Sequence, residues 1–166
     1  MNGGTISSGV SVGNVPTNWS IAGSSGKGIL WRNTGGDVAL WQMNGGTVSS
    51  AVSLGNVPTS WSIVGAGDFN GDGNTDILWR DSSGNVAMWL LNSNGTVASG
   101  VSVGTVPTAW SIVETGDFDG DGKSDILWRD TSGNVVVWTM NGGTVSSSLA
   151  VANVSTAWTI QGTNAD

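Results

Sequence analysis

Residues 117–125 read Asp-Phe-Asp-Gly-Asp-Gly-Lys-Ser-Asp, and Ile-Leu-Trp-Arg follows at 126–129. The same unit occurs upstream, where residues 68–76 read Asp-Phe-Asn-Gly-Asp-Gly-Asn-Thr-Asp and Ile-Leu-Trp-Arg follows at 77–80. Oxygen-bearing side chains recur at positions 1, 3, 5 and 9 of each unit, with glycine at position 6. Alternate positions let a tight loop direct several oxygens at one point, which is how proteins bind hard cations such as calcium. The unit therefore predicts a calcium loop between two β-strands.

The second half of this unit differs from an EF-hand. The opening D-x-[DN]-x-[DN]-G is shared with that motif, but an EF-hand needs a bidentate Glu at position 12. This chain has Trp79 or Trp128 there. The alternative interpretation is a turn without metal, because Asp, Asn and Gly favour turns in any case. Against it, the clustered acids would repel one another without a cation, and the pattern occurs twice.

The composition indicates one β-rich, turn-rich domain. The chain has 166 residues with 27 Gly, 10 Trp and 3 Pro, and it has no Cys, His or Tyr. It lacks the long apolar run of a transmembrane helix, so membrane insertion is not expected. Its first residues lack the basic and apolar regions of a signal peptide.

The net charge of −7 comes from the two acidic units. Seven of the 12 Asp and Glu lie in residues 68–76 and 117–125, and the other five balance the 5 Lys and Arg. There is no basic stripe, so neither nucleic acid nor an anionic membrane is an expected partner.

An internal repeat of about 48 residues runs through the chain. We place the repeats at approximately 1–42, 43–90, 91–139 and 140–166, the last one partial, within a single domain of residues 1–166. The first copy is shorter because residues 21–28, Ile-Ala-Gly-Ser-Ser-Gly-Lys-Gly, replace the acidic unit. That copy has no carboxylate at this place, so no calcium is expected there.

Four short strand-like segments occur in each repeat. In the second copy they cover about 61–67, 76–80 and 85–91, with the fourth at 47–55 or, one repeat later, 96–104. Glycine-rich turns join them. Four antiparallel strands per 40–50 residues, repeated, are typical of a β-propeller blade. A β-solenoid is the next alternative, but its repeats are usually shorter, and a sandwich fits near-identical repeats less well.

The runs from Gly67 to Leu78 and from Gly116 to Leu127 resemble FG-GAP/VCBS-type repeats, as found in the integrin α-subunit propeller and in bacterial secreted and surface proteins. The resemblance implies an all-β, calcium-binding β-propeller with about two Ca²⁺ per chain. It assigns ligand roles to Asp68, Asn70, Asp72, Asp76, Asp117, Asp119, Asp121 and Asp125, and to the backbone carbonyls of Asn74 and Lys123.

The number of strands raises the question of how a ring would close. The chain begins with the last strand of one blade, continues with three complete blades, and ends with the first strand of another blade at 158–161. Propellers usually need four or more blades. Either the chain is a fragment of a longer propeller, or several chains close one ring. Unsatisfied blade faces and strand edges favour association, so we expect a homo-oligomer.

The tryptophans recur at fixed positions of the repeat. Large flat side chains fill the wedge between blades well. We expect core positions for Trp31, Trp41, Trp79, Trp89, Trp128 and Trp138. Two positions are open for Trp19, Trp61, Trp110 and Trp158: the core, or a partly exposed rim where they could stack on sugars.

One arginine per repeat follows a tryptophan, at Arg32, Arg80 and Arg129. One interpretation is an inter-blade ion pair or a hydrogen bond to backbone. The other is a contact to a sugar hydroxyl or carboxylate in each blade, so that weak sites add by avidity.

These features favour a binding or adhesion module rather than an enzyme. His, Cys and Tyr are absent, and the calcium loops account for the paired carboxylates. The expected partners are a glycan or an extracellular protein, and the alternative is a purely structural or self-assembling repeat protein, natural or engineered. Family resemblance and the millimolar calcium outside cells imply secretion or display at the cell surface.

Overall fold

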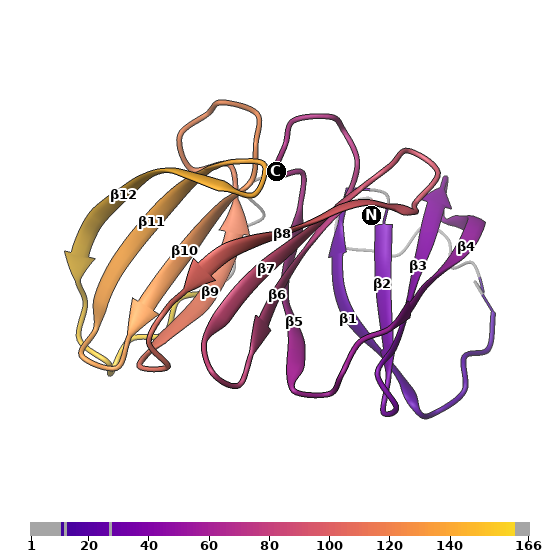
Figure 1. Ribbon diagram of the computed structural model, residues 1–166, viewed down its shortest axis with the longest axis horizontal. Coiled ribbons are helices and arrows are strands. Elements are labelled where there is room, and N and C mark those ends of the chain that lie inside the picture. Colours follow the sequence, from indigo (N-terminus) through magenta and orange to yellow (C-terminus); the bar gives the residue numbers. More distant parts are fainter. Residues whose placement is uncertain (1–10, 12, 27, 162–166) are drawn as a thin grey trace, which may run out of the picture.

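The computed structural model describes residues 11, 13–26 and 28–161, and this part of the chain contains twelve strands and no helix. Each set of four consecutive strands forms one antiparallel sheet (Figure 1). We name the sheets blade 1 (β1–β4), blade 2 (β5–β8) and blade 3 (β9–β12). The strands are β1 (Trp19–Ser25), β2 (Gly28–Asn33), β3 (Asp37–Asn44), β4 (Thr47–Asn56), β5 (Trp61–Gly67), β6 (Asp76–Asp81), β7 (Asn85–Leu91), β8 (Val97–Thr105), β9 (Trp110–Gly116), β10 (Asp125–Asp130), β11 (Asn134–Asn141) and β12 (Thr144–Asn153).

A short side-chain-stabilised turn joins the second and third strands of each blade. In blade 2, Asp81 Oδ1 accepts hydrogen bonds from the backbone N–H groups of Ser83 and Asn85, at 2.9 and 2.8 Å. Gly84 completes the turn at φ 90°, a left-handed conformation that glycine adopts without steric cost. Hydrogen bonding from the Asn85 side chain lowers the pKa of Asp81. This acid therefore has a structural role in the turn.

The hydrophobic cores lie between neighbouring blades. One cluster combines Leu30 and Leu40 of blade 1 with Ile77 and Trp79 of blade 2. The second cluster joins blades 2 and 3 in the same way, through Leu78, Val86, Met88, Ile126, Trp128 and Met140. Alternate residues of a strand point to opposite faces of its sheet, so the middle blade supplies one face to each cluster.

The blades stand side by side in chain order (Figure 1). Their first strands are neighbours, since β1 contacts β5 and β5 contacts β9. Within the described residues, blade 1 and blade 3 each leave one sheet face without a neighbouring blade. The all-β, propeller-like arrangement of four-stranded blades is thus confirmed, with three blades. No helix long and apolar enough to cross a membrane was found in the described part.

The expected strand at 158–161 is wrong. These residues adopt no strand, and Trp158 is 72% exposed. A strand needs a hydrogen-bonded neighbour, and none is placed beside this segment in the described structure. The strand expected ahead of Trp19 falls mostly on residues outside the described ones, as does Lys27. The repeat boundaries drawn at 42/43, 90/91 and 139/140 fall inside β3, β7 and β11, whereas each blade begins at a tryptophan.

Candidate functional site

The acidic loops join β5 to β6 and β9 to β10 and rise above the blades in Figure 1. Their first aspartate organises each loop. Asp117 Oδ1 accepts hydrogen bonds from the N–H groups of Gly120 and Asp121, and its Oδ2 accepts from Gly122 at 2.9 Å. Asp68 binds the corresponding N–H groups in the upstream loop. Both loops therefore have the same conformation, which the hydrogen bonds of their own first aspartate stabilise.

Two glycines in each loop have left-handed backbone. Gly120 and Gly122 have φ values of 81° and 82°, and Gly71 and Gly73 have 77° and 80°. A side chain would be strained at these angles. The sequence identified the glycine at position 6, and the structure adds the one at position 4. Glycine at both positions is thus a further signal for this loop.

The downstream loop brings three carboxylates together. One oxygen each from Asp117, Asp119 and Asp125 lies within 4.8 Å of the others. In the sequence of the upstream loop, Asn70 stands at the position of Asp119. Carboxylate and amide oxygens are the ligands that calcium prefers. The residue types of both loops suit this ion, and in the downstream loop their oxygens also converge.

The last aspartate of each loop is buried and anchors the loop to the blade. Asp125 Oδ2 accepts from the backbone N–H of Phe118 at 3.0 Å, and its Oδ1 accepts from that of Met140 at 2.9 Å. Asp76 binds the N–H groups of Phe69 and Leu91 in the same way. The loop end is thereby tied to the third strand of its blade.

Burial raises the pKa of Asp76 to about 6, although the two N–H donors work in the opposite direction. The charges of Asp72 and Asp68 raise it further. Burial likewise raises the pKa of Asp125. Ionising a buried carboxyl beside other acids costs free energy. A bound cation removes that cost and favours the ionised form.

Other predicted ligands lie in the loops but outside this cluster. Asp121 Oδ2 forms a salt bridge with Lys123 Nζ at 3.0 Å, and the hydrogen bond from Lys123 lowers the pKa of Asp121. Asp72 Oδ2 accepts from the Asn70 side chain at 3.0 Å. The backbone N–H groups of Asn74 and Lys123 donate to Asp72 and Asp121. The proposed use of these residues as ligands stays a prediction.

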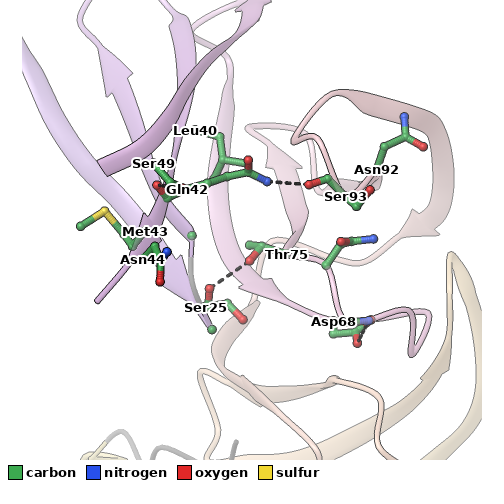
Figure 2. A pocket seen from close by; sticks show the side chains of 14 residues that line it. Ser25, Leu40, Gln42, Met43, Asn44, Ser49, Asp68, Thr75, Asn92 and Ser93 are labelled. Carbon is green, nitrogen blue, oxygen red and sulfur yellow. Dashed lines mark hydrogen bonds between the residues drawn. The ribbon is translucent and has the colours of Figure 1, made fainter. Parts of the chain in front are cut away.

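A polar cavity of about 580 Å³ occupies the junction of blades 1 and 2, beside the short turn that replaces the acidic loop. Figure 2 shows two hydrogen bonds across it, from Thr75 Oγ1 to the carbonyl of Ser25 and from Gln42 Nε2 to that of Ser93. The counterpart of Gln42 in blade 2 is Leu90. At the junction of blades 2 and 3, Leu90 and Phe69 of the acidic loop both belong to the hydrophobic core. The absence of the loop and the Leu-to-Gln difference thus make this end of the junction polar, beside its hydrophobic core. Sequence reasoning missed this cavity because it depends on contacts between two repeats.

Each repeated arginine holds the connection to the next blade. Arg80 Nη2 donates to the carbonyls of Val106 and Pro107, at 3.1 and 3.0 Å, and Nη1 donates to that of Trp110. Its guanidinium carbon lies 5.3 Å from the centroid of the Trp128 ring. Arg32 and Arg129 bind the equivalent carbonyls. These contacts are the backbone hydrogen bonds of the first interpretation, and a role in ligand binding stays a prediction.

The tryptophans gather into one aromatic group per blade. Trp79 and Trp128 are almost fully buried and lie about 5 Å, centroid to centroid, from Trp89 and Trp138 respectively. Together with the tryptophan that starts its blade, each pair lines a hollow. The hollow beside Trp61 in blade 2 has a volume of about 240 Å³, and the one beside Trp110 in blade 3 about 250 Å³. Half-buried positions are found for Trp19, Trp31, Trp41, Trp61, Trp89, Trp110 and Trp138.

The comparison with known protein families gave one match. Residues 68–128 match the family model described as FG-GAP-like repeat, a span that includes both acidic loops. No match was found among curated proteins. The predicted resemblance to FG-GAP/VCBS-type propeller repeats is therefore confirmed over these residues. Such repeats are typical of non-catalytic propellers and suggest a binding module.

Proposed function

Since FG-GAP-like repeats cover both acidic loops, we propose that this chain is a calcium-binding β-propeller module. It holds one ion in residues 68–76 and one in residues 117–125, and none in its first repeat. Asp117, Asp119 and Asp125 supply carboxylate oxygens to one ion, and Asp68, Asn70 and Asp76 supply oxygens to the other. Asp72 and Asp121, with the carbonyls of Asn74 and Lys123, complete the proposed ligand sets.

The convergence of three carboxylate oxygens within 4.8 Å is the observation that carries this proposal. Like charges at such a separation repel one another, and burial of Asp125 adds to the cost of ionising it. A divalent cation would offset both effects and would hold the hairpins of β5–β6 and β9–β10 closed. At a hundredfold excess over its dissociation constant, an ion stabilises the fold by about 2.7 kcal/mol.

Calcium stoichiometry tests the proposal directly. Native mass spectrometry and isothermal titration calorimetry of the chelator-treated protein should report two ions per chain. Asp125→Asn should remove one ion, Asp76→Asn the other, and the double variant both. The melting temperature should rise with calcium in the unaltered protein and stay constant in the double variant.

Asp130→Asn is the matched control, because Asp130 lies outside the loop and the first blade has Asn33 at this position. This variant should keep both ions. A protein that takes up no calcium, or whose melting temperature is the same in EDTA and in calcium, would contradict the proposal. The loops would then be Asp/Asn/Gly turns without metal.

As a module, the chain would act in binding or adhesion outside the cell or at its surface, where millimolar calcium would fill such loops. It would do so without catalysis. A glycan or an extracellular protein is the partner class, and a purely structural role is the alternative.

A second candidate function is multivalent glycan binding. It is favoured by the recurrence of the same three-tryptophan hollow at both blade junctions, beside Trp61 and Trp110. Indole faces stack on the apolar faces of sugar rings. Two identical weak sites per chain would add by avidity. Trp19 and Trp158 hold the same position in the repeat and were predicted for this role too.

A glycan array probed with calcium-loaded protein tests this candidate, followed by calorimetry with the best-bound sugar. Trp110→Ala should lower the number of sites from two to one, while near-UV circular dichroism verifies the fold. Gln42→Leu, which copies blade 2, should leave binding unchanged. Binding that Gln42→Leu abolishes would place the sugar in the polar cavity, and an array without any hit would reject glycan binding.

A further inference from the structure

Each blade has a forward face, which packs on the following blade, and a rear face, which packs on the preceding one. The forward face contains Leu30, Val38, Leu40 and Leu54 in blade 1, Leu78, Val86, Met88 and Val103 in blade 2, and Leu127, Val135, Val137 and Val151 in blade 3. The rear face contains Ile21, Ile29 and Trp31 in blade 1, Ile63, Ile77 and Trp79 in blade 2, and Ile112, Ile126 and Trp128 in blade 3. Forward-to-rear packing therefore occurs twice within the chain, between matching residues.

Within the described residues, no blade packs on the third forward face, although Val135 and Val137 at its centre are only 6% and 9% exposed. Leu30 and Leu78 are fully buried, whereas Leu127 at the same position is only half-buried. Val151 is 60% exposed and its neighbour Leu149 is 53% exposed. On the edge of this face, Phe118 is half-buried, although its counterpart in blade 2 is fully buried. Around the buried centre of this face, blade 3 thus presents apolar side chains that are more exposed than their equivalents in blades 1 and 2.

In the part of the chain that the structure describes, no blade packs on the first rear face either. Ile21 is 61% exposed, while its counterparts in blades 2 and 3 are half-buried. Ile29 and Trp31 are half-buried, whereas Ile77 and Trp79 are 0% and 2% exposed. A molecule with one free forward face and one free rear face can associate with a copy of itself.

A recurring arginine–tryptophan contact between blades supports a second copy of this chain as the partner. Arg32 lies over the ring of Trp79 and Arg80 over that of Trp128, each with 5.3 Å between guanidinium carbon and ring centroid. Arg129 is the third arginine of this series and Trp31 is the third indole. In a head-to-tail contact they would meet across two chains.

The segment after β12 does not seal the forward face. Trp158 and Ile160 align with Trp61 and Ile63, the start of β5, but they form no strand and are 72% and 37% exposed. Strand β1 of a second copy, held by its own sheet, would take the place of this segment.

We propose that the forward face of blade 3 binds the rear face of blade 1 of a second copy, repeating the junctions between blades 1 and 2 and between blades 2 and 3. Contacts of this kind are heterologous, and they form a ring when the rotation closes. The apolar patches on blades 1 and 3 are then interfaces between subunits.

Light scattering coupled to size exclusion measures this association on the full chain with calcium present. The unaltered protein should have a mass above the 16.8 kDa of one chain. Val151→Asp on the forward face and Ile21→Lys on the rear face should each give monomers. Both side chains are exposed in the single chain, so its fold should persist, as circular dichroism can verify. Thr131→Asp, at an exposed turn, is the control and should associate normally.

Mixing the two monomeric variants distinguishes a head-to-tail contact from a face-to-same-face contact. The mixture should associate again, because each variant keeps one intact face and the altered faces carry opposite charges. A monomeric unaltered protein would overturn the proposal, and so would association that either variant alone leaves intact.

Discussion

At the residue scale, the buried aspartate that ends each loop holds the loop to its blade and is also a proposed calcium ligand. Asp76 accepts two backbone hydrogen bonds, from Phe69 in the loop and from Leu91 in β7. Burial holds its pKa at about 6, well above the ordinary value of 3.8. The metal-free folded protein therefore binds a proton at Asp76 more tightly than the unfolded chain does.

This shift predicts a pH dependence with a definite sign. Because the pKa is raised in the folded state, the contribution of Asp76 to stability is fully present below pH 4 and is lost as the pH rises through about 6. Urea unfolding in EDTA should show a smaller free energy of unfolding at pH 7 than at pH 4.5. Asp76→Asn should reduce this difference, the remainder coming from Asp125, whose pKa burial also raises, and Asp130→Asn should preserve it. An unchanged pH dependence in Asp76→Asn would show that burial of this carboxylate has no such effect.

At the element scale, the connections between blades depend on one arginine each. The segment between β8 and β9 contains Pro107, which cannot donate a backbone hydrogen bond and suits a connection rather than a strand. Its carbonyls are instead bound by Arg80, whose planar fork reaches three acceptors at once. Stacking on Trp128 then joins the connection to the core between blades 2 and 3.

Arg80→Lys should destabilise the protein, because a lysine cannot span the same carbonyls or stack in the same way. The expected loss is about 1.5–3 kcal/mol, typical of hydrogen bonds to a charged group. Arg129→Lys should cost less in the isolated chain, since no indole of a following blade lies under Arg129 in the described structure. Chemical denaturation of both variants measures the difference, and equal losses would exclude the contribution of stacking.

At the scale of the whole molecule, the same junction is used wherever two blades meet. The copies are not equivalent, however. The junction of blades 1 and 2 contains a polar cavity beside Gln42, whereas that of blades 2 and 3 is filled by Phe69 and Leu90. Within the described residues, blades 1 and 3 each have one face without a neighbouring blade. In the head-to-tail association proposed above, the same junction would be repeated between chains.

Most elements could be predicted from the sequence because their signals are local. The strand-like segments predicted at 61–67, 76–80 and 85–91 match β5, β6 and β7 to within one residue, and glycine-rich turns join them. The spacing of oxygen-bearing residues located both loops, since each loop is shaped by its own side chains. The repeat then implied that neighbouring blades are alike.

Only the tertiary structure decided what depends on distant segments. The partners of Arg80 are backbone carbonyls about 26–30 residues away, and a carbonyl has no sequence signature. The same holds for the bond from Met140 N–H to Asp125. The segment at 158–161 has the sequence of a strand but lacks a neighbouring strand, so its local preference does not suffice. A strand and an inter-blade site each need a second surface, and the fold alone determines which surfaces meet.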